Sequence, residues 1–289
     1  MLANAYGSDV MTDVLSRHRN FGVLEGPVLL FGGPYSNFEA TASLFERASL
    51  MGITGQRTIC TGDVCAYCGN PAETARLVMG SGAHVIAGNC EVSLGERAAD
   101  CGCGFEDGAA CDRFAMEWFR FADEELDDGS RAWMRSLPGI GTFCAYGKRY
   151  AVVHGAASAV NRFIWPVMSD SVLCDEIGLI EAALGPVDGV IAGHTGMAFE
   201  RVVSIGERPV RWINTGAIGL PAHDGDVRTS FAVLTAEGVR FERLDYDHET
   251  ASAAMRAAGL RAGYDRSLTS GYWPSEDSFP SEMRLGRVA

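Results

Sequence analysis

The chain has 289 residues, of which 47% are hydrophobic and 21% charged, as is ordinary for a globular protein with a large core. Its formal net charge is -13 and it has only 24 Lys and Arg residues, which argues against a broad surface for nucleic-acid backbones. No run of ~18 apolar residues is present, so we expect no membrane-spanning helix.

The first residues, 1–24, predict a polar lead-in with a short amphipathic helix over Asp9–Arg19. Charged residues precede any long apolar run, so no secretory signal is expected. The nine cysteines are an odd number, which favours free thiols or metal ligands over a disulfide framework. We therefore predict a cytoplasmic protein.

Strands and helices are then predicted to alternate as far as residue 87, which indicates a largely parallel sheet. The predicted strands are Pro27–Phe31, Arg57–Cys60 and Val85–Ala87, and the predicted helices are Phe38–Ala48 and Asn70–Val78. Asn70 is a favourable helix cap and Pro71 a favourable first-turn residue.

Residues 92–137 interrupt this alternation with a cysteine-rich loop and a helix predicted over Asp112–Leu126. The segment is too short to form a core of its own, so we interpret it as an excursion over the mouth of a site.

The second half predicts a hairpin over Thr142–Val153, a helix over Asp175–Leu184 and a set of glycine-punctuated β segments. The β segments are Val190–Gly193, Val202–Ser204, Arg211–Asn214, Ser230–Leu234 and Arg240–Arg243. They favour a second, more antiparallel sheet. We therefore predict an α/β (α+β) fold in which two packed mixed β-sheets are flanked by helices, as one domain over 1–289. Its C-terminal part, 245–289, is predicted as a helix, His248–Ala258, and a poorly ordered Pro-, Ser- and Gly-rich tail.

Four predicted strands end in a small residue followed by a polar side chain. These ends supply Asp63, Asn89, His154 and His194. In α/β folds, ligands bind in crevices at the carboxyl ends of strands. One carboxylate, one amide oxygen and two imidazoles suit a divalent first-row metal such as Mn, Fe or Zn. The alternative is a hydrogen-bonded polar cluster in a protein that has kept the fold and lost the ion.

The order and spacing of these motifs resemble the calcineurin-like metallophosphoesterase superfamily, especially its small bacterial phosphodiesterase-like branch. The matching residues, which run from about Val28 to Ala258, are Ser36-Asn37, Gly62-Asp63, Gly88-Asn89 with Glu91, His154-Gly155, Gly193-His194 and Asn214-Thr215-Gly216. The resemblance implies an αββα four-layer sandwich with its site at the strand ends. It also implies that Asp63, Asn89, His154 and His194 correspond to one complete metal site.

The chain departs from the family pattern at the other metal site. Gly33 and Gly196 stand where the family has an Asp and a His, and Tyr35 stands where it has another His. Because glycine offers no ligand atom, we expect a mononuclear site or none. Tyr35 remains an alternative ligand through a phenolate, as in the related purple acid phosphatases.

Further site residues follow from the resemblance. Cys90 occupies the position of the histidine that assists the leaving group, and Glu91 and Asn37 line the same site. His223 lies in a turn that the family keeps near its site, which makes it a candidate substrate contact.

The cysteines allow a second interpretation, in which thiolates hold zinc or an iron–sulfur cluster. Cys65 and Cys68 have ligand spacing, and a glycine-rich loop carries Cys101 and Cys103, with Cys111 beyond it. Buried cysteines are also often simple core residues.

We therefore predict a metal-dependent phosphoric ester hydrolase that acts on a small phosphorylated molecule, a phosphomonoester or phosphodiester. The alternatives are a catalytically silent ligand-binding or regulatory protein on the same fold, and a cysteine-ligated metal or redox protein. The sequence does not define the substrate or the oligomeric state.

Overall fold

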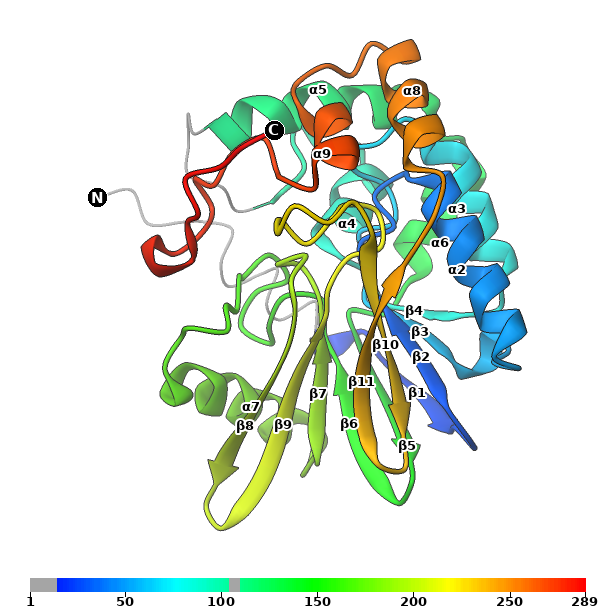
Figure 1. Ribbon diagram of the computed structural model, residues 1–289. Coiled ribbons are helices and arrows are strands. Elements are labelled where there is room, and N and C mark those ends of the chain that lie inside the picture. The colour runs from blue at the N-terminus through cyan, green and yellow to red at the C-terminus, as the bar shows by residue number, and fades with distance from the viewer. Residues whose placement is uncertain (1–14, 104–109) are drawn as a thin grey trace.

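The computed structural model describes residues 15–103 and 110–289, the side chains of 110–113 excepted. Two mixed sheets pack face to face and helices cover their outer faces (Figure 1). This arrangement confirms the predicted fold class. None of the helices in the described ranges is long and apolar enough to cross a bilayer.

The six-stranded sheet has the order β1-β5-β6-β7-β9-β8. Its strands are β1 His18–Val23, β5 Ile140–Ala145, β6 Lys148–Val152, β7 Gly189–Ala192, β8 Ala198–Ile205 and β9 Arg208–Thr215. The five-stranded sheet has the order β11-β10-β2-β3-β4. Its strands are β2 Val28–Phe31, β3 Thr58–Cys60, β4 His84–Val85, β10 Thr229–Thr235 and β11 Gly238–Leu244.

The helices lie mostly where the sequence predicts them. They are α2 Phe38–Leu50, α3 Pro71–Gly80, α4 Asn89–Gly95, α5 Ala110–Glu125, α6 Asp128–Ser136, α7 Asp170–Leu184, α8 His248–Ala257 and α9 Tyr264–Ser270. Helices α4, α6 and α9 were not predicted from the sequence. Asn70 makes no side-chain capping bond to α3, so only the first-turn Pro71 acts as expected.

Alternation along β2 shows how the layers form. Val28 and Leu30 pack between the two sheets with Ile191 and Ile213, whereas Leu29 packs beneath the helices of the five-stranded sheet. Successive strand residues point to opposite faces, so a strand buried on both faces reads as a continuous apolar run. The core between the sheets fixes how the strand ends of one sheet meet those of the other.

The N-terminal prediction holds only in part, and the predicted division of the sheets was wrong. Leu15 and Ser16, within the predicted helix Asp9–Arg19, are helical, but His18 already begins β1, which pairs parallel with β5; residues 1–14 lie outside the described ranges. The sheets also do not divide by halves of the chain, because β1 joins the six-stranded sheet while β10 and β11 join the five-stranded one. Strand partners are chosen by tertiary packing, which local patterns do not encode.

The described parts of the excursion, residues 92–103 and 110–137, pack on the five-stranded sheet's side of the molecule. Trp118, Phe119 and Met134 belong to the same hydrophobic core as Leu29 and Phe31. Arg131 is buried and pairs with Asp123 at 2.8 Å. The excursion therefore shares a core with the sheet and does not form one of its own.

Candidate metal centre

The loops after β3, β4, β6 and β7 carry the four predicted ligands to one edge of the two sheets, the upper edge in Figure 1. Asp63, His154 and His194 each present one ligand atom, and these atoms lie within 4.8 Å of one another. Among the residues whose side chains are described, this is the one group of three or more His, Cys, Asp or Glu side chains with such spacing.

The orientation of His154 is fixed by its other ring nitrogen. Nδ1 lies 2.6 Å from the carbonyl oxygen of Thr61, which can only accept a hydrogen bond, so Nδ1 carries the proton. The Nε2 lone pair then faces Asp63 Oδ2 at 3.2 Å and His194 Nδ1 at 3.0 Å. A backbone acceptor behind a ring is the usual way to orient a metal-binding histidine.

Asp63 is placed by its backbone as much as by its side chain. Its φ of 57° is in the left-handed region, which non-glycine residues seldom adopt, and His194 has a φ of 65°. Such strain persists where surrounding contacts determine it, often at functional sites. The Cys90 amide donates to Asp63 Oδ1 at 3.3 Å, which leaves Oδ2 directed at the imidazoles.

Glu91 holds the Asp63 loop in this conformation. Its carboxylate accepts the backbone amides of Asp63 and Val64, both at 2.7 Å, and of Gly88 at 2.9 Å. Burial, and next the charge of Asp63, raise the pKa of Glu91. Both carboxylate oxygens of Glu91 are engaged with the backbone, so these contacts hold the loop that carries Asp63.

The fourth candidate ligand, Asn89, has one side-chain atom without a partner. Its Nδ2 donates to the carbonyl oxygen of Cys101 at 2.9 Å, but its buried Oδ1 has no hydrogen-bond partner. Buried polar atoms are normally satisfied, and exceptions call for an explanation. A cation bound with Asp63, His154 and His194 would satisfy this oxygen, so the donor set fits one divalent ion.

The charges of the cluster are coupled. Burial acts to raise the pKa of Asp63, but His154 and then His194 outweigh it and hold that pKa well below its usual range. Burial opposes the charging of His154 as well, yet the Asp63 carboxylate raises the pKa of this ring. Burial lowers the pKa of His194.

Aromatic rings lie against the two glycines that depart from the family pattern, Gly33 and Gly196. A Cβ on Gly33 would lie 2.5 Å from the ring of Tyr35, and a Cβ on Gly196 would lie 3.0 Å from the ring of Trp273. Burial raises the pKa of Tyr35 well above its usual value, followed by the charge of Asp63. This shift favours the neutral phenol of Tyr35 over the phenolate in a site that holds no cation.

The cysteines do not assemble a thiolate site among the described residues. Cys65 Sγ donates to the carbonyl oxygen of Pro71 and Cys68 Sγ to that of Gly219, so the two thiols are directed to different partners. Cys101 and Cys103 are joined in a disulfide, and the Cys111 side chain lies outside the description. Burial raises the pKa of Cys65, Cys68 and Cys90, which disfavours their thiolate forms.

Two other candidates have structural contacts. Asn37 caps α2 by accepting the Ala40 amide at 3.0 Å, and its Nδ2 donates to Gly219 and to Tyr246. His223 is buried and uses both ring nitrogens, one toward Glu276 and one toward the Trp273 amide, so no nitrogen is left for a substrate. The polar atoms of both side chains are therefore engaged in hydrogen bonds within the protein, which could not be predicted from the sequence alone.

Several residues that shape the site were not predicted from the sequence. Phe163 stacks on His194 with ring centroids 4.2 Å apart. Tyr264 and Trp273, from the predicted poorly ordered tail, line a cavity with Asp63 and His194. That tail is in fact packed over the site, so the prediction of disorder was wrong. Its aromatic residues were the available signal, since Tyr272-Trp273 and Phe279 are unusual in a disordered segment.

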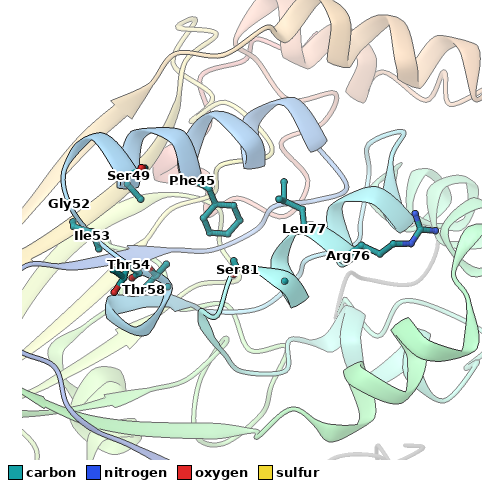
Figure 2. Close-up of a pocket in the computed structure, with 12 residues that line it drawn as sticks. Phe45, Ser49, Gly52, Ile53, Thr54, Thr58, Arg76, Leu77 and Ser81 are labelled. Atoms are coloured by element: carbon teal, nitrogen blue, oxygen red, sulfur yellow. Dashed lines mark hydrogen bonds between the residues drawn. The ribbon is translucent and has the colours of Figure 1, made fainter.

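A larger hollow of about 520 Å³ lies elsewhere, at the carboxyl ends of α2 and α3 (Figure 2). Phe45 and Leu77 line it between the two helices, with Thr54 and Ser81 at its edge. None of the four candidate ligands lines it, so volume alone does not identify the chemical site.

Two solved structures share this architecture. A metallophosphoesterase from Sphaerobacter thermophilus superposes with a TM-score of 0.64 at 21% identity, covering 86% of this chain and 100% of its own. A hypothetical protein from Pyrococcus horikoshii OT3 superposes with a TM-score of 0.68 at 17% identity, covering 86% of this chain and 99% of its own. No protein-family profile and no curated protein matches the sequence. At these identities the likeness establishes the metallophosphoesterase fold, as the motifs predicted.

Proposed function

On this fold, we propose that the chain is a metal-dependent phosphoric ester hydrolase with a mononuclear site formed by Asp63, Asn89, His154 and His194. The observation that carries the proposal is the convergence of the Asp63, His154 and His194 ligand atoms within 4.8 Å of one another; the buried Asn89 Oδ1, which has no hydrogen-bond partner, supports it. A bound divalent cation supplies Lewis acidity, which polarises a phosphoryl oxygen and acidifies water.

The chain's own residues perform the positioning. Thr61 fixes the tautomer of His154, Glu91 fixes the Asp63 loop, and Phe163 supports the ring of His194. The substrate class that we propose is a small phosphomonoester or phosphodiester. A bound cation would attract its phosphate locally, although the chain has a net charge of -13. A cytoplasmic location and the absence of a nucleic-acid partner belong to the same proposal.

A silent ligand-binding protein is the second candidate, and one observation favours it. The cavity beside Asp63 and His194 is only about 30 Å³, and Tyr35 and Trp273 stand against Gly33 and Gly196. A catalytic site must admit a substrate, so activity requires that this cavity open. A cysteine-bound metal finds no support among the described side chains.

Elemental analysis of protein purified without added metal or chelator tests the proposal. We expect about one first-row ion per chain in the wild type, and its loss in His154→Ala and in the milder His154→Gln. His84→Ala is the matched control, because His84 lies outside the ligand group. Circular dichroism verifies that each variant is folded.

Hydrolysis of p-nitrophenyl phosphate and of bis(p-nitrophenyl) phosphate is measured on the same samples. Loss of hydrolysis together with the metal supports the enzyme. Metal binding without hydrolysis of either ester favours the silent protein, whereas a metal content unchanged in both His154 variants contradicts the proposed ligands.

A further inference from the structure

The C-terminal segment, defined here as residues 271–289, forms the outer wall of the metal pocket. Trp273, Pro274, Ser275 and Ser278 line the cavity together with Asp63 and His194. In Figure 1 this red segment lies beside the loops that follow β6 and β7. The segment is therefore part of the site although it follows the last strand.

The enclosed volume decides what the pocket admits in this conformation. The cavity measures about 30 Å³. Small-molecule sites usually measure ~300–1,000 Å³. A cavity near 30 Å³ accommodates a water molecule or an ion, but no phosphate ester. Some part of the wall has to move before such a ligand reaches Asp63.

Trp273 is the aromatic residue that the C-terminal segment contributes to that wall. Its ring lies against Gly196, its Nε1 donates to the Pro221 carbonyl oxygen at 2.7 Å, and its amide donates to His223 Nδ1 at 2.8 Å. These bonds tie the segment to the loop between β9 and β10. They are local contacts and can break without disrupting either sheet.

Glu276 organises the remainder of the segment. Its buried carboxylate accepts His223 Nε2 at 2.8 Å, the Leu285 amide at 2.8 Å and the Gly286 amide at 2.9 Å. The Glu276 side chain thus links the segment to the loop between β9 and β10 through His223. It also links the first part of the segment to residues 285 and 286. Charged hydrogen bonds of this kind are stronger than neutral ones.

The segment also has a site about which it can turn. Gly271 ends α9 with a φ of 77°, a conformation that glycine adopts without strain. Beyond it, the only regular element is the short 3₁₀ turn Ser281–Met283. The segment is therefore held by side chains and not by ladder hydrogen bonds: by Glu276, and by the buried ring of Phe279, which packs edge-on against His223 and Trp165 and has to move with it.

We propose that residues 271–289 are a gate over the metal pocket, held closed by Glu276 on His223 and opened by rotation about Gly271. Trp273 is the residue whose displacement admits a ligand larger than a single ion. The chemical nature of that ligand, a phosphate ester, rests on the proposed function; the gating does not.

The test compares Glu276→Gln with Glu282→Gln in metal-free protein. Glu282 lies in the same segment but is exposed, so its variant controls for the loss of one negative charge. Hydrogen exchange of residues 272–289, followed by mass spectrometry, reports opening. Modification of His194 by diethyl pyrocarbonate, mapped by mass spectrometry with His248 as internal reference, reports access to the pocket.

We expect Glu276→Gln to accelerate both exchange of the segment and modification of His194 by about tenfold, and Glu282→Gln to behave as the wild type. Trp273→Ala, which leaves the Glu276 bonds in place, is expected to accelerate His194 modification as well. It serves as the second variant if Glu276→Gln does not fold.

Three outcomes overturn the gate. They are unchanged exchange in Glu276→Gln, exchange that increases throughout the chain, and faster exchange of the segment without faster modification of His194. All readouts use metal-free protein and no substrate. These readouts therefore stay valid if the protein proves not to be a hydrolase. A failure of the gate and a failure of the proposed function can be told apart.

Discussion

Asp63 Oδ2 lies 3.2 Å from His154 Nε2, although Asp63 follows a strand of the five-stranded sheet and His154 a strand of the six-stranded sheet. The packing between the sheets therefore sets the distance between two candidate ligands. A ligand bound by both residues also links the sheets, so binding at this point couples directly to the stability of the fold.

Metal binding is accordingly expected to stabilise the protein against heat. Because an ion that binds only the folded state contributes RT ln(1 + [L]/Kd), Mn²⁺ or Zn²⁺ at a hundred times its Kd adds about 2.7 kcal/mol. Differential scanning calorimetry measures the shift in Tm. His194→Ala should show no shift, and His84→Ala should shift as the wild type does; equal shifts in all three would place the ion elsewhere.

Removal of the Glu91 carboxylate is expected to destabilise the fold strongly. Glu91→Ala leaves the amides of Asp63, Val64 and Gly88 without their acceptor, and buried unsatisfied donors cost on the order of 3 kcal/mol together. Urea unfolding measures the loss. Glu96→Ala, at an exposed position directly after the helix α4 that contains Glu91, should change stability little. Similar losses in the two variants would mean that the carboxylate does not support the loop.

The contribution of Glu276 to stability is expected to depend on pH. Burial acts against its ionisation, but the bond from His223 and the amides of residues 285–287 outweigh it and lower the pKa from 4.5 to about 2. A depressed folded-state pKa stabilises the fold above the unfolded value, and this stability is lost as the pH falls through the folded value.

The wild type should therefore exceed Glu276→Gln in free energy of unfolding by a constant amount above about pH 5, and by a shrinking amount toward about pH 2. Urea unfolding of both proteins across this range measures the difference. A difference that does not change with pH would show that the Glu276 charge is not involved.

A histidine at residue 196 is expected not to restore a second metal. Its Cβ would lie 3.0 Å from the Trp273 ring, and the φ of 68° at Gly196 disfavours any L side chain by about 1–2 kcal/mol. Elemental analysis of Gly196→His should give the metal content of the wild type. An extra ion per chain would show that Trp273 yields to the imidazole, and Gly196→His combined with Trp273→Ala tests the steric argument directly.

The cysteine interpretation is tested by Cys65→Ala and Cys68→Ala, singly and together. Each thiol donates to a different backbone carbonyl, so neither variant should alter the metal content. Inductively coupled plasma mass spectrometry measures it. A content that falls in the double variant alone would establish a thiolate site after all.

The sequence by itself predicted much of the regular structure and the candidate ligands. The β-rich runs before Asp63, Asn89, His154 and His194 have local signatures, in which an apolar run stops at a small residue and a polar side chain. The alternation of strands and helices in the first half, and the glycine-punctuated β segments in the second, also indicated two packed sheets. The strand ends and the two sheets could be inferred because both depend on residues that are close in the chain. The period of apolar side chains and the turn residues between strands determine such local structure.

Other assignments failed because they depend on contacts between distant residues. β1 has a mostly exposed, weakly apolar sequence and becomes a strand by pairing with β5. Asn37, Glu91 and His223 are typical site residues by type, yet the backbone and the C-terminal segment use their polar atoms.

The tertiary structure alone decided that the C-terminal segment closes the pocket and that Tyr35 and Trp273 lie against Gly33 and Gly196. Gly196 and Trp273 are far apart in the chain and share no local pattern. Which ring fills the space above a glycine depends on how the two sheets, the helices and the final segment pack together, because close packing leaves that space to a single side chain.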